Sequence, residues 1–489
     1  MRVNHLPPFS LLAAICLSIL PGCRTPSRIS DPQLTFEVPQ ADSRPAPSVD
    51  PNWWNEFKNS QLSANIIEAL TNNPDLQIAA ARMQAAGQVA KIEGAARYPT
   101  LSLDGGAIKQ RQNFIGLPIP GAPGGVLVSK NQSFNLTMLA SWELDLWGRL
   151  SAANQAAQAD AEAASLDLAA AQLSIAGQTA LAWIDATTAQ MQRNLAKQTL
   201  DSYERTKNLV EKRFQRGTRP SIDLRLSKNN VASALASLEQ AEIQSQSRIR
   251  VLQTLMGAYP DGQMDVANDL PSISPLPNSG VPADLLSRRP DLRAVERRLY
   301  ATDQRVLEAE RNLLPRISLA TGGGRVTSEV DDLLNNNFSV WSLAANLSQP
   351  LFQGGRLLAG IDLSKAQQKE SAAQYVKTAL QAFREAETAF RNEDRLKALL
   401  TARTSAAEES KAASELAFAR YRNGVDTLLT VLESDRRNFL DQSQLIEARA
   451  QLLSNRIQLY LALGGGFSPS KAALEETESA PLAAQSFNP

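Results

Sequence analysis

The chain has 489 residues, with 50 basic and 50 acidic side chains, one histidine and two cysteines. This balance of charge excludes the basic surface that binding to nucleic acid requires. Aromatic residues make up only 6% of the chain, which is thin for large packed cores, and helix-forming residues dominate the rest. We therefore expect a mainly helical, elongated protein with fewer strands.

Residues 1–22 are predicted to be a secretory signal. Arg2 precedes an apolar run from Phe9 to Leu20 that is too short to span a bilayer. The following Pro21-Gly22-Cys23 is similar, together with Leu20, to the lipobox of bacterial lipoproteins. This similarity implies that Cys23 is lipidated and that residues 23–52 form an extended tether behind the lipid. The alternative is ordinary cleavage near Gly22 that leaves Cys23 as a free thiol.

Cleavage of the signal changes the chemistry that is available. It removes Arg2, His5 and Cys16, so the mature chain has 49 basic and 50 acidic residues, no histidine and one lipidated cysteine. This excludes histidine acid-base catalysis, a cysteine nucleophile, a disulfide and a metal site of His and Cys. Chemistry that uses only Asp and Glu stays open. We expect no enzyme, no cofactor and no metal site.

The chain is an internal duplication. Asn73-Pro74-Asp75-Leu76 recurs as Arg289-Pro290-Asp291-Leu292, a shift of 216, whereas Gly148-Arg149-Leu150 recurs as Gly355-Arg356-Leu357, a shift of 207. The first copy is therefore nine residues longer, between Gly106 and Gly148. We expect a first repeat at 53–257, a linker or equatorial segment at 258–282, a second repeat at 283–466 and a polar tail at 467–489.

In each copy a helical pattern, at about 60–96 and 283–313, ends at Pro99 or Pro315. Apolar and polar residues then alternate, as in 134–141 and 341–348, which predicts strands with one apolar face. Loops rich in Gly, Pro or Asn at 116–125 and 331–337 separate the strands of each pair. Each copy therefore predicts a helix followed by two strands.

A long helical hairpin completes each copy. Residues 151–216 and 358–423 contain no proline, and a continuous helix of about 66 residues would be roughly 100 Å long. After a turn at Gly217 or Gly424, a second helix of about 37 residues returns to Gly257 or Gly464, where a C-cap glycine belongs.

The number of strands predicts oligomerisation. Four strands cannot close a barrel, and open sheet edges are not tolerated in lipid, so strands that enter a membrane require further copies. A dimer would give eight strands with a filled interior, whereas a trimer would give twelve and leave a conduit. The helices would continue this ring as a tunnel.

Several segments between about Asn52 and Phe467 carry a family resemblance. They are Trp53-Trp54-Asn55-Glu56-Phe57, Ser141-Trp142-Glu143-Leu144-Asp145-Leu146-Trp147-Gly148-Arg149-Leu150, Leu285-Leu286-Ser287-Arg288-Arg289-Pro290-Asp291-Leu292-Arg293, Gln349-Pro350-Leu351-Phe352-Gln353-Gly354-Gly355-Arg356, Arg420-Tyr421-Arg422-Asn423-Gly424-Val425 and Leu463-Gly464-Gly465-Gly466-Phe467. Together they resemble the TolC-like outer-membrane factors of tripartite efflux systems, in the lipoprotein branch (OprM-like, NodT-like) that serves RND pumps.

The resemblance implies a homotrimer in the outer membrane of a Gram-negative bacterium. A 12-stranded β-barrel in outer-membrane lipid would join a periplasmic α-barrel, with an equatorial domain near the linker. The channel would passively export drugs and other small molecules that an inner-membrane RND pump delivers through a periplasmic adaptor protein.

The turns of the two hairpins are the periplasmic tips in this family. The resemblance assigns contact with the adaptor to Arg216, Gly217, Thr218, Asn423, Gly424 and Val425. It assigns the periplasmic gate to Arg420, Tyr421, Leu429 and Glu433, with Asp223 of the first tip as a partner for a basic residue. Three copies of Leu429 would dewet a constriction and three copies of Glu433 would attract cations. The alternative for each is a solvated helix residue.

Two other functions within the same architecture stay open, namely type I protein secretion and efflux of metal cations. An alternative of a different class is a periplasmic coiled-coil lipoprotein scaffold without a pore. Such a scaffold predicts no strands.

Overall fold

The computed structural model describes residues 51–114, 127–273 and 288–465. The predicted signal, Cys23, almost all of the tether, the loop at 116–125 and the tail at 467–489 lie outside these residues. In the described ranges no helix is both long and apolar enough to cross a membrane.

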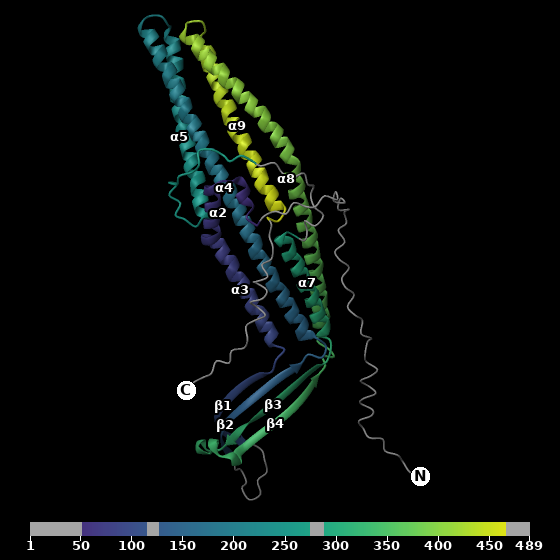
Figure 1. Cartoon of the computed structure of the whole chain (residues 1–489). Helices are drawn as coiled ribbons and strands as arrows, with labels where there is room; N and C mark the ends of the chain where they lie inside the picture. Colours follow the sequence, from purple (N-terminus) through teal and green to yellow (C-terminus); the bar gives the residue numbers. More distant parts are fainter. Residues whose placement is uncertain (1–50, 115–126, 274–287, 466–489) are drawn as a thin grey trace. The chain divides into compact units, whose positions relative to one another are not determined.

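Each copy contains one or two helices, two strands and a long helical hairpin (Figure 1). The elements of the first copy are η1 (Trp53–Phe57), α2 (Ser60–Asn72), α3 (Pro74–Ala95), β1 (Thr100–Phe114), β2 (Leu127–Leu144), α4 (Arg149–Gln215) and α5 (Ser221–Leu255). Those of the second are α7 (Pro290–Arg311), β3 (Arg316–Thr327), η2 (Val330–Leu334), η3 (Asn336–Phe338), β4 (Ser339–Ser348), α8 (Arg356–Arg422) and α9 (Leu428–Ala462). The predicted long helices and four strands are confirmed.

The helical segment expected at 60–96 is not continuous. It breaks at Asn73, which has extended backbone and is followed by Pro74, the first residue of α3. Proline has no N–H to donate to the preceding turn, but it is well suited to the first position of a new helix. The Asn73 side chain caps that helix, because its Oδ1 accepts from the Asp75 N–H at 2.8 Å.

The duplication extends to individual hydrogen bonds. Asn73 Nδ2 donates to the carbonyl of Leu255 at 2.8 Å, at the end of α5. Arg289, which occupies the position of Asn73 in the second copy, donates from Nη1 to the carbonyl of Ala462 at 3.4 Å, at the end of α9. Each hairpin therefore returns to the start of its own copy, where a side chain satisfies a terminal carbonyl of the helix.

The two predicted C-cap glycines have positive φ, +73° at Gly257 and +86° at Gly464. A Cβ at Gly257 would lie 2.7 Å from the carbonyl oxygen of Asn72, and one at Gly464 would lie 2.8 Å from that of Arg288. Left-handed backbone and a close neighbouring chain both require glycine here.

The chain divides into two compact units that do not follow the two copies. The described part of one unit comprises residues 88–114, 127–160 and 298–376, and includes all four strands. The described part of the other comprises residues 51–87, 161–273, 288–297 and 377–465.

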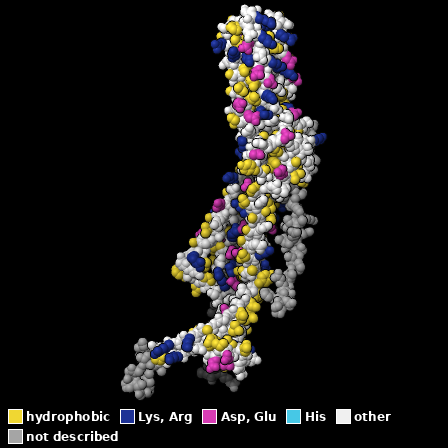
Figure 2. Space-filling view, turned by 90° about the vertical axis from the view of Figure 1, so that its left-hand side faces the viewer, with side chains coloured by type: hydrophobic (Ala, Val, Ile, Leu, Met, Phe, Trp, Pro, Cys, Tyr) yellow, Lys and Arg dark blue, Asp and Glu magenta, His cyan; other side chains and the backbone are white. Residues whose placement is uncertain are grey.

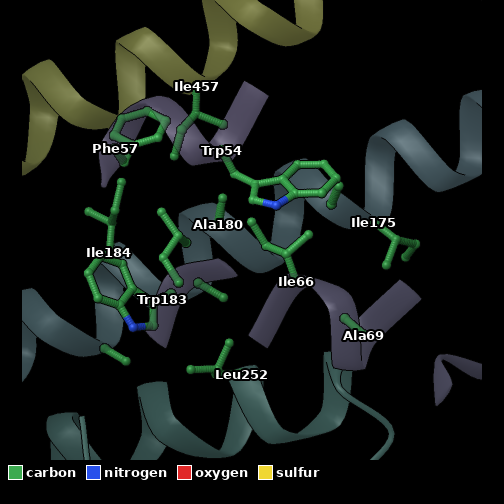
Figure 3. Packing of buried hydrophobic residues seen from close by; sticks show 14 of the residues in the cluster. Trp54, Phe57, Ile66, Ala69, Ile175, Ala180, Trp183, Ile184, Leu252 and Ile457 are labelled. Atoms are coloured by element: carbon green, nitrogen blue, oxygen red, sulfur yellow. The ribbon is translucent and has the colours of Figure 1, made fainter. Parts of the chain in front are cut away.

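The unit without strands has a hydrophobic core to which η1 contributes Trp53, Trp54 and Phe57 (Figure 3). The ring of Trp53 is fully buried and stacks on Tyr460 of α9, with ring centroids 5.6 Å apart. The Tyr460 hydroxyl donates to Glu56. Residues from η1, α2, α4, α5 and α9 meet in this core, among them Trp54, Phe57, Ile66, Trp183, Ile184, Leu252 and Ile457.

Candidate membrane face and hairpin tips

The sheet is amphipathic because of its register. Its strands are ordered β1-β2-β3-β4 and all neighbours are antiparallel. Met138 lies opposite both Leu103 and Gly323, and side chains alternate along each strand. The apolar residues of one face are Leu101, Leu103, Ala107, Phe134, Leu136, Met138, Ala140, Trp142, Leu144, Ile317, Leu319, Trp341, Leu343, Ala345 and Leu347. Arg325 lies on the same face and donates to the carbonyl of Leu333 and to Asn336 Oδ1 in the β3–β4 connection.

This apolar face is exposed in the single chain. Trp341 is 83% exposed and Leu343 is 72% exposed. The opposite face is mainly polar or glycine and includes Ser102, Asp104, Asn135, Thr137, Ser141, Glu143, Ser318, Gly322, Gly324, Ser342 and Asn346. An apolar sheet face of this extent in contact with water is unfavourable, so it requires another environment.

The strands have the length that a bilayer requires. β3 has 12 residues and β4 has 10, and a tilted strand needs about 9–11 to cross the hydrocarbon core. Two indoles lie at the end of the sheet that adjoins the helices. Trp142 Nε1 donates to the carbonyl of Arg97 at 2.9 Å, and Trp147 Nε1 donates to that of Pro315 at 2.7 Å.

β1 and β4 form the two edges of the sheet. Within the described ranges no further strand pairs with either of them. Their outer N–H and C=O groups can be satisfied by water, but in lipid each would cost several kcal/mol.

Both hairpin tips turn at a glycine. φ is +72° at Gly217 and +81° at Gly424, and nothing lies within 4 Å of a Cβ built at either. The Thr218 N–H returns to the carbonyl of Arg213, and the Val425 N–H to that of Arg420, both at 3.0 Å. The two helix ends are therefore capped in the same way.

One arginine joins the two tips, which lie side by side (Figure 1). Arg213 Nη1 donates to the carbonyl of Tyr421 at 3.1 Å, and Nη2 donates to that of Arg422 at 2.7 Å. The cation thus neutralises the negative end of α8. Arg213 and Arg219 also lie 5.0 and 5.2 Å from the centre of the Tyr421 ring, within the range of a cation–π contact.

The predicted gate residues fall into different surroundings. Leu429 is 70% exposed, and Glu433 is exposed one helical turn further on the same side of α9. Glu433 pairs with Arg436 at 2.6 Å, and this hydrogen-bonded cation lowers the pKa of the Glu433 carboxyl. The exposed side of α9 near the tip, which we call its free side, therefore carries the apolar Leu429 and the charged pair Glu433–Arg436.

The other predicted gate residues are less accessible or are paired with neighbours. Arg420 forms an ion pair with Asp426 at 2.7 Å. Asp223 is half-buried and makes no ion pair with any described residue. The side chain of Tyr421 is fully buried in a cluster with Val210, Leu428, Val431 and Leu432. Tyr421 thus packs the tips together and does not present its ring to solvent.

Two residues of the tip region were not among the predicted site residues. Arg213 lies in the last turn of α4, a position typical of cations that interact with helix ends, and this could have drawn attention to it. Asp435 of α9 is only 2% exposed and accepts from Ser414 Oγ of α8 at 2.5 Å. Burial raises the pKa of Asp435, and hydrogen bonds from Ser414 and Ser202 and the charge of Arg205 oppose this shift.

The family of outer membrane efflux proteins matches residues 65–258 and 281–465, which correspond to the two copies. The chain belongs to this family. The solvent efflux pump outer membrane protein SrpC of Pseudomonas putida is 31% identical over 481 residues, which are 96% of this chain and 100% of SrpC. The pyoverdine export outer membrane protein OpmQ of Pseudomonas aeruginosa is 31% identical and covers 86% of this chain, with 89% of OpmQ matched.

Among solved structures, VceC of Vibrio cholerae has a TM-score of 0.78 and 27% identity, and the match covers 86% of this chain and 100% of VceC. The predicted TolC-like fold, the outer-membrane location and the function as an efflux channel are confirmed by these relatives. The residues that match the family include both hairpin tips and all four strands.

Proposed function

We propose that three copies of this outer-membrane efflux protein close into one channel. The observation that carries this proposal is the open, amphipathic four-stranded sheet. Three copies would pair each β1 edge with a β4 edge and give twelve strands, with the apolar face toward lipid and the polar face toward a water-filled lumen. Two copies would give a barrel of eight strands, and side chains would fill the interior of such a barrel.

The tips are the proposed contact with a periplasmic adaptor that connects the channel to an inner-membrane RND pump. Arg216, Gly217 and Thr218 of the first tip and Asn423, Gly424 and Val425 of the second are all exposed. Val425 is 63% exposed, so its side chain is accessible to a partner. Relatives named for solvents, toluene and pyoverdine favour small organic molecules over proteins or metal cations as the exported substrates.

Passive conduction fits a channel that is lined by this sheet and these helices. We assign no catalytic step and no cofactor to this channel. The proposed gate comprises Leu429 and Glu433, which share the free side of α9, with Arg420 and Asp223 nearby in the two tips. Tyr421 would act on this gate by fixing the packing of the tip helices.

Oligomeric state and conduction test the proposal together. The full-length protein, purified in nonionic detergent, is expected to have the mass of three chains in native mass spectrometry. In a planar bilayer it is expected to give discrete conductance steps. A stable monomer or dimer, or a trimer without any conductance under voltage, would contradict the proposal.

Lipidation of Cys23 is a separate proposal that rests on the lipobox. Radiolabelled palmitate should be incorporated by the wild-type chain and not by Cys23→Ser. Equal labelling of the two would show that another site, or none, carries the lipid.

A further inference from the structure

The strand pair β1–β2 extends past the rest of the sheet. β2 pairs with β3 only from Leu144 to Phe134, where Phe134 lies opposite Thr327. β1 and β2 remain paired beyond this point, from Ile108 opposite Ser133 to Phe114 opposite Leu127. This extension lies in the segment that makes the first copy longer than the second.

Three cations lie on one face of the extension. Lys109 is opposite Gln132, and Arg111 is opposite Lys130. The β1–β2 register has no interruption from Thr100 to Phe114, so alternation places Lys109, Arg111 and Lys130 on the same face as Leu103, Ala107 and Phe134. On β1 and β2, this face therefore changes from apolar to basic where the extension begins.

The charges of this cluster are not compensated within the described chain. The side chains of Lys109, Arg111 and Lys130 are exposed, and none of them forms an ion pair with a described residue. The two strands of the extension contain no Asp or Glu. Figure 2 shows Lys and Arg side chains gathered on this strand pair. Like charges directly opposite each other, such as Arg111 and Lys130, weaken strand pairing, so an anion on this face would stabilise it.

We propose that Lys109, Arg111 and Lys130 bind the phosphate groups of phosphorylated lipid headgroups at the outer surface of the membrane. The inference rests on the proposed function, because the apolar face must be in contact with lipid. The ends of the strands that adjoin the helices face the periplasm, so the extension leaves the membrane on the outer side. The phosphorylated glycolipid of the outer leaflet is the anion available there.

The depth of the cluster fits this partner. Lys109 lies two residues beyond Ala107, and Lys130 lies four residues beyond Phe134. At about 3.3 Å per residue these are roughly 7 and 13 Å along the strands. With Ala107 and Phe134 at the hydrocarbon edge and a tilt of about 45°, Lys109 and Lys130 are roughly 5 and 9 Å above that edge. The headgroup layer is about 5–8 Å thick, so Lys109 lies within it and Lys130 lies at its outer limit.

Carboxylates of the β3–β4 connection, Glu329, Asp331 and Asp332, are the other anions near this end of the sheet. None of them forms an ion pair with the cluster in the described chain. A second copy that supplied these carboxylates is the competing occupant, and the experiment distinguishes it from lipid.

The test measures lipid binding by the full-length protein in nonionic detergent, with native mass spectrometry as the readout. The probes are bisphosphorylated lipid A and the same lipid after removal of its phosphates. Lys109→Gln/Arg111→Gln/Lys130→Gln is compared with wild type and with Lys91→Gln/Lys369→Gln/Lys411→Gln. The control removes the same charge from three exposed cations on helices that form no ion pair with described residues.

Each cation near an anionic lipid surface contributes roughly fivefold, so the triple variant is expected to bind bisphosphorylated lipid A about 100-fold more weakly. The control variant is expected to bind like wild type. Equal affinity of wild type and triple variant would overturn the inference, as would loss of assembly in the triple variant without a change in lipid binding.

If the triple variant fails to fold, the comparison of the two lipids on the wild-type protein tests the inference. Removal of the phosphates from lipid A must then weaken its binding at least about tenfold, and equal binding of the two lipids would overturn the inference. Conductance in a planar bilayer is measured on the same samples. A wild-type protein that binds lipid A but does not conduct would count against the proposed channel and not against this site.

Discussion

At the scale of single residues, the free side of α9 offers the sharpest test of the gate. Leu429 and Glu433 are exposed there, one helical turn apart. Leu429→Ala combined with Glu433→Ala should raise single-channel conductance severalfold, because a wider and less apolar constriction is easier to wet. Leu440→Ala, half-exposed on the same helix but further from the tip, should leave conductance at the wild-type level. Unchanged conductance in the double variant would remove both residues from the gate.

Tyr421 tests whether the tips are held together by packing. Its ring is buried, and its hydroxyl has no hydrogen-bond partner in the described chain. Tyr421→Ala should lower the local free energy of opening by about 3–5 kcal/mol, as measured by amide hydrogen exchange in residues 203–224 and 418–435. Tyr421→Phe removes only the unpartnered hydroxyl and should exchange at the wild-type rate or more slowly. Wild-type exchange in the alanine variant would contradict this account.

The burial of Asp435 predicts that the stability of the tip region depends on pH. Burial raises its pKa in the folded chain, so its contribution to stability is largest at low pH, where it is protonated, and is lost as pH rises through the raised pKa. Asp435→Asn should therefore raise the thermal unfolding midpoint at about pH 7.5 more than at about pH 5. An equal rise of the unfolding midpoint at both pH values would show that burial does not raise the pKa of this carboxyl.

At the scale of elements, two adjacent glycines of β3 test the register of the sheet. A Cβ at Gly324 would lie 2.2 Å from the carbonyl oxygen of Leu136 and 2.6 Å from Cα of Thr137, whereas one at Gly323 would come no closer than 3.9 Å to any neighbour. Gly324→Ala should reduce the amount of assembled protein in outer-membrane fractions. The new Cβ would meet backbone atoms of β2, which cannot move aside as the end of a side chain can. Gly323→Ala should assemble normally. Equal amounts of the two variants would contradict the register.

The elements themselves could largely be predicted from the sequence. The long helices follow from runs of about 66 residues without proline, and the strands follow from alternation after Pro99 and Pro315. The break at Asn73 was missed because apolar spacing continues across it. Proline at the first position of a helix and proline that ends a helix look alike in periodicity.

The site could be predicted only in part, since contacts between elements distant in sequence decide it. The spacing that places Leu429 and Glu433 on one side of α9 is local and can be read from sequence. The burial of Tyr421 depends on Val210 of α4 and Val431 of α9, and the bond from Arg213 to the other tip joins residues about 200 positions apart. Helix packing, which periodicity alone does not specify, sets these contacts.

At the scale of the whole molecule, the duplication is both a sequence pattern and a structural one. Asn73 and Arg289 differ chemically, yet each donates to a carbonyl at the end of the hairpin of its own copy. The additional nine residues of the first copy lie in the segment that contains the β1–β2 extension, and the second copy has no corresponding basic cluster on β3 and β4. The two copies therefore share their hairpin closure and differ in this basic cluster.

Accumulation of a fluorescent small organic compound in living cells tests the central claim most directly. The host is a strain that lacks this gene and the genes of its other outer-membrane efflux channels. Expression of the wild-type chain together with its adaptor and pump should lower accumulation severalfold, whereas Gly324→Ala, which is expected to assemble less, should lower it less. Equal accumulation with and without the wild-type chain, while the pump and adaptor are present, would contradict the assignment of this protein as the outer-membrane channel for efflux.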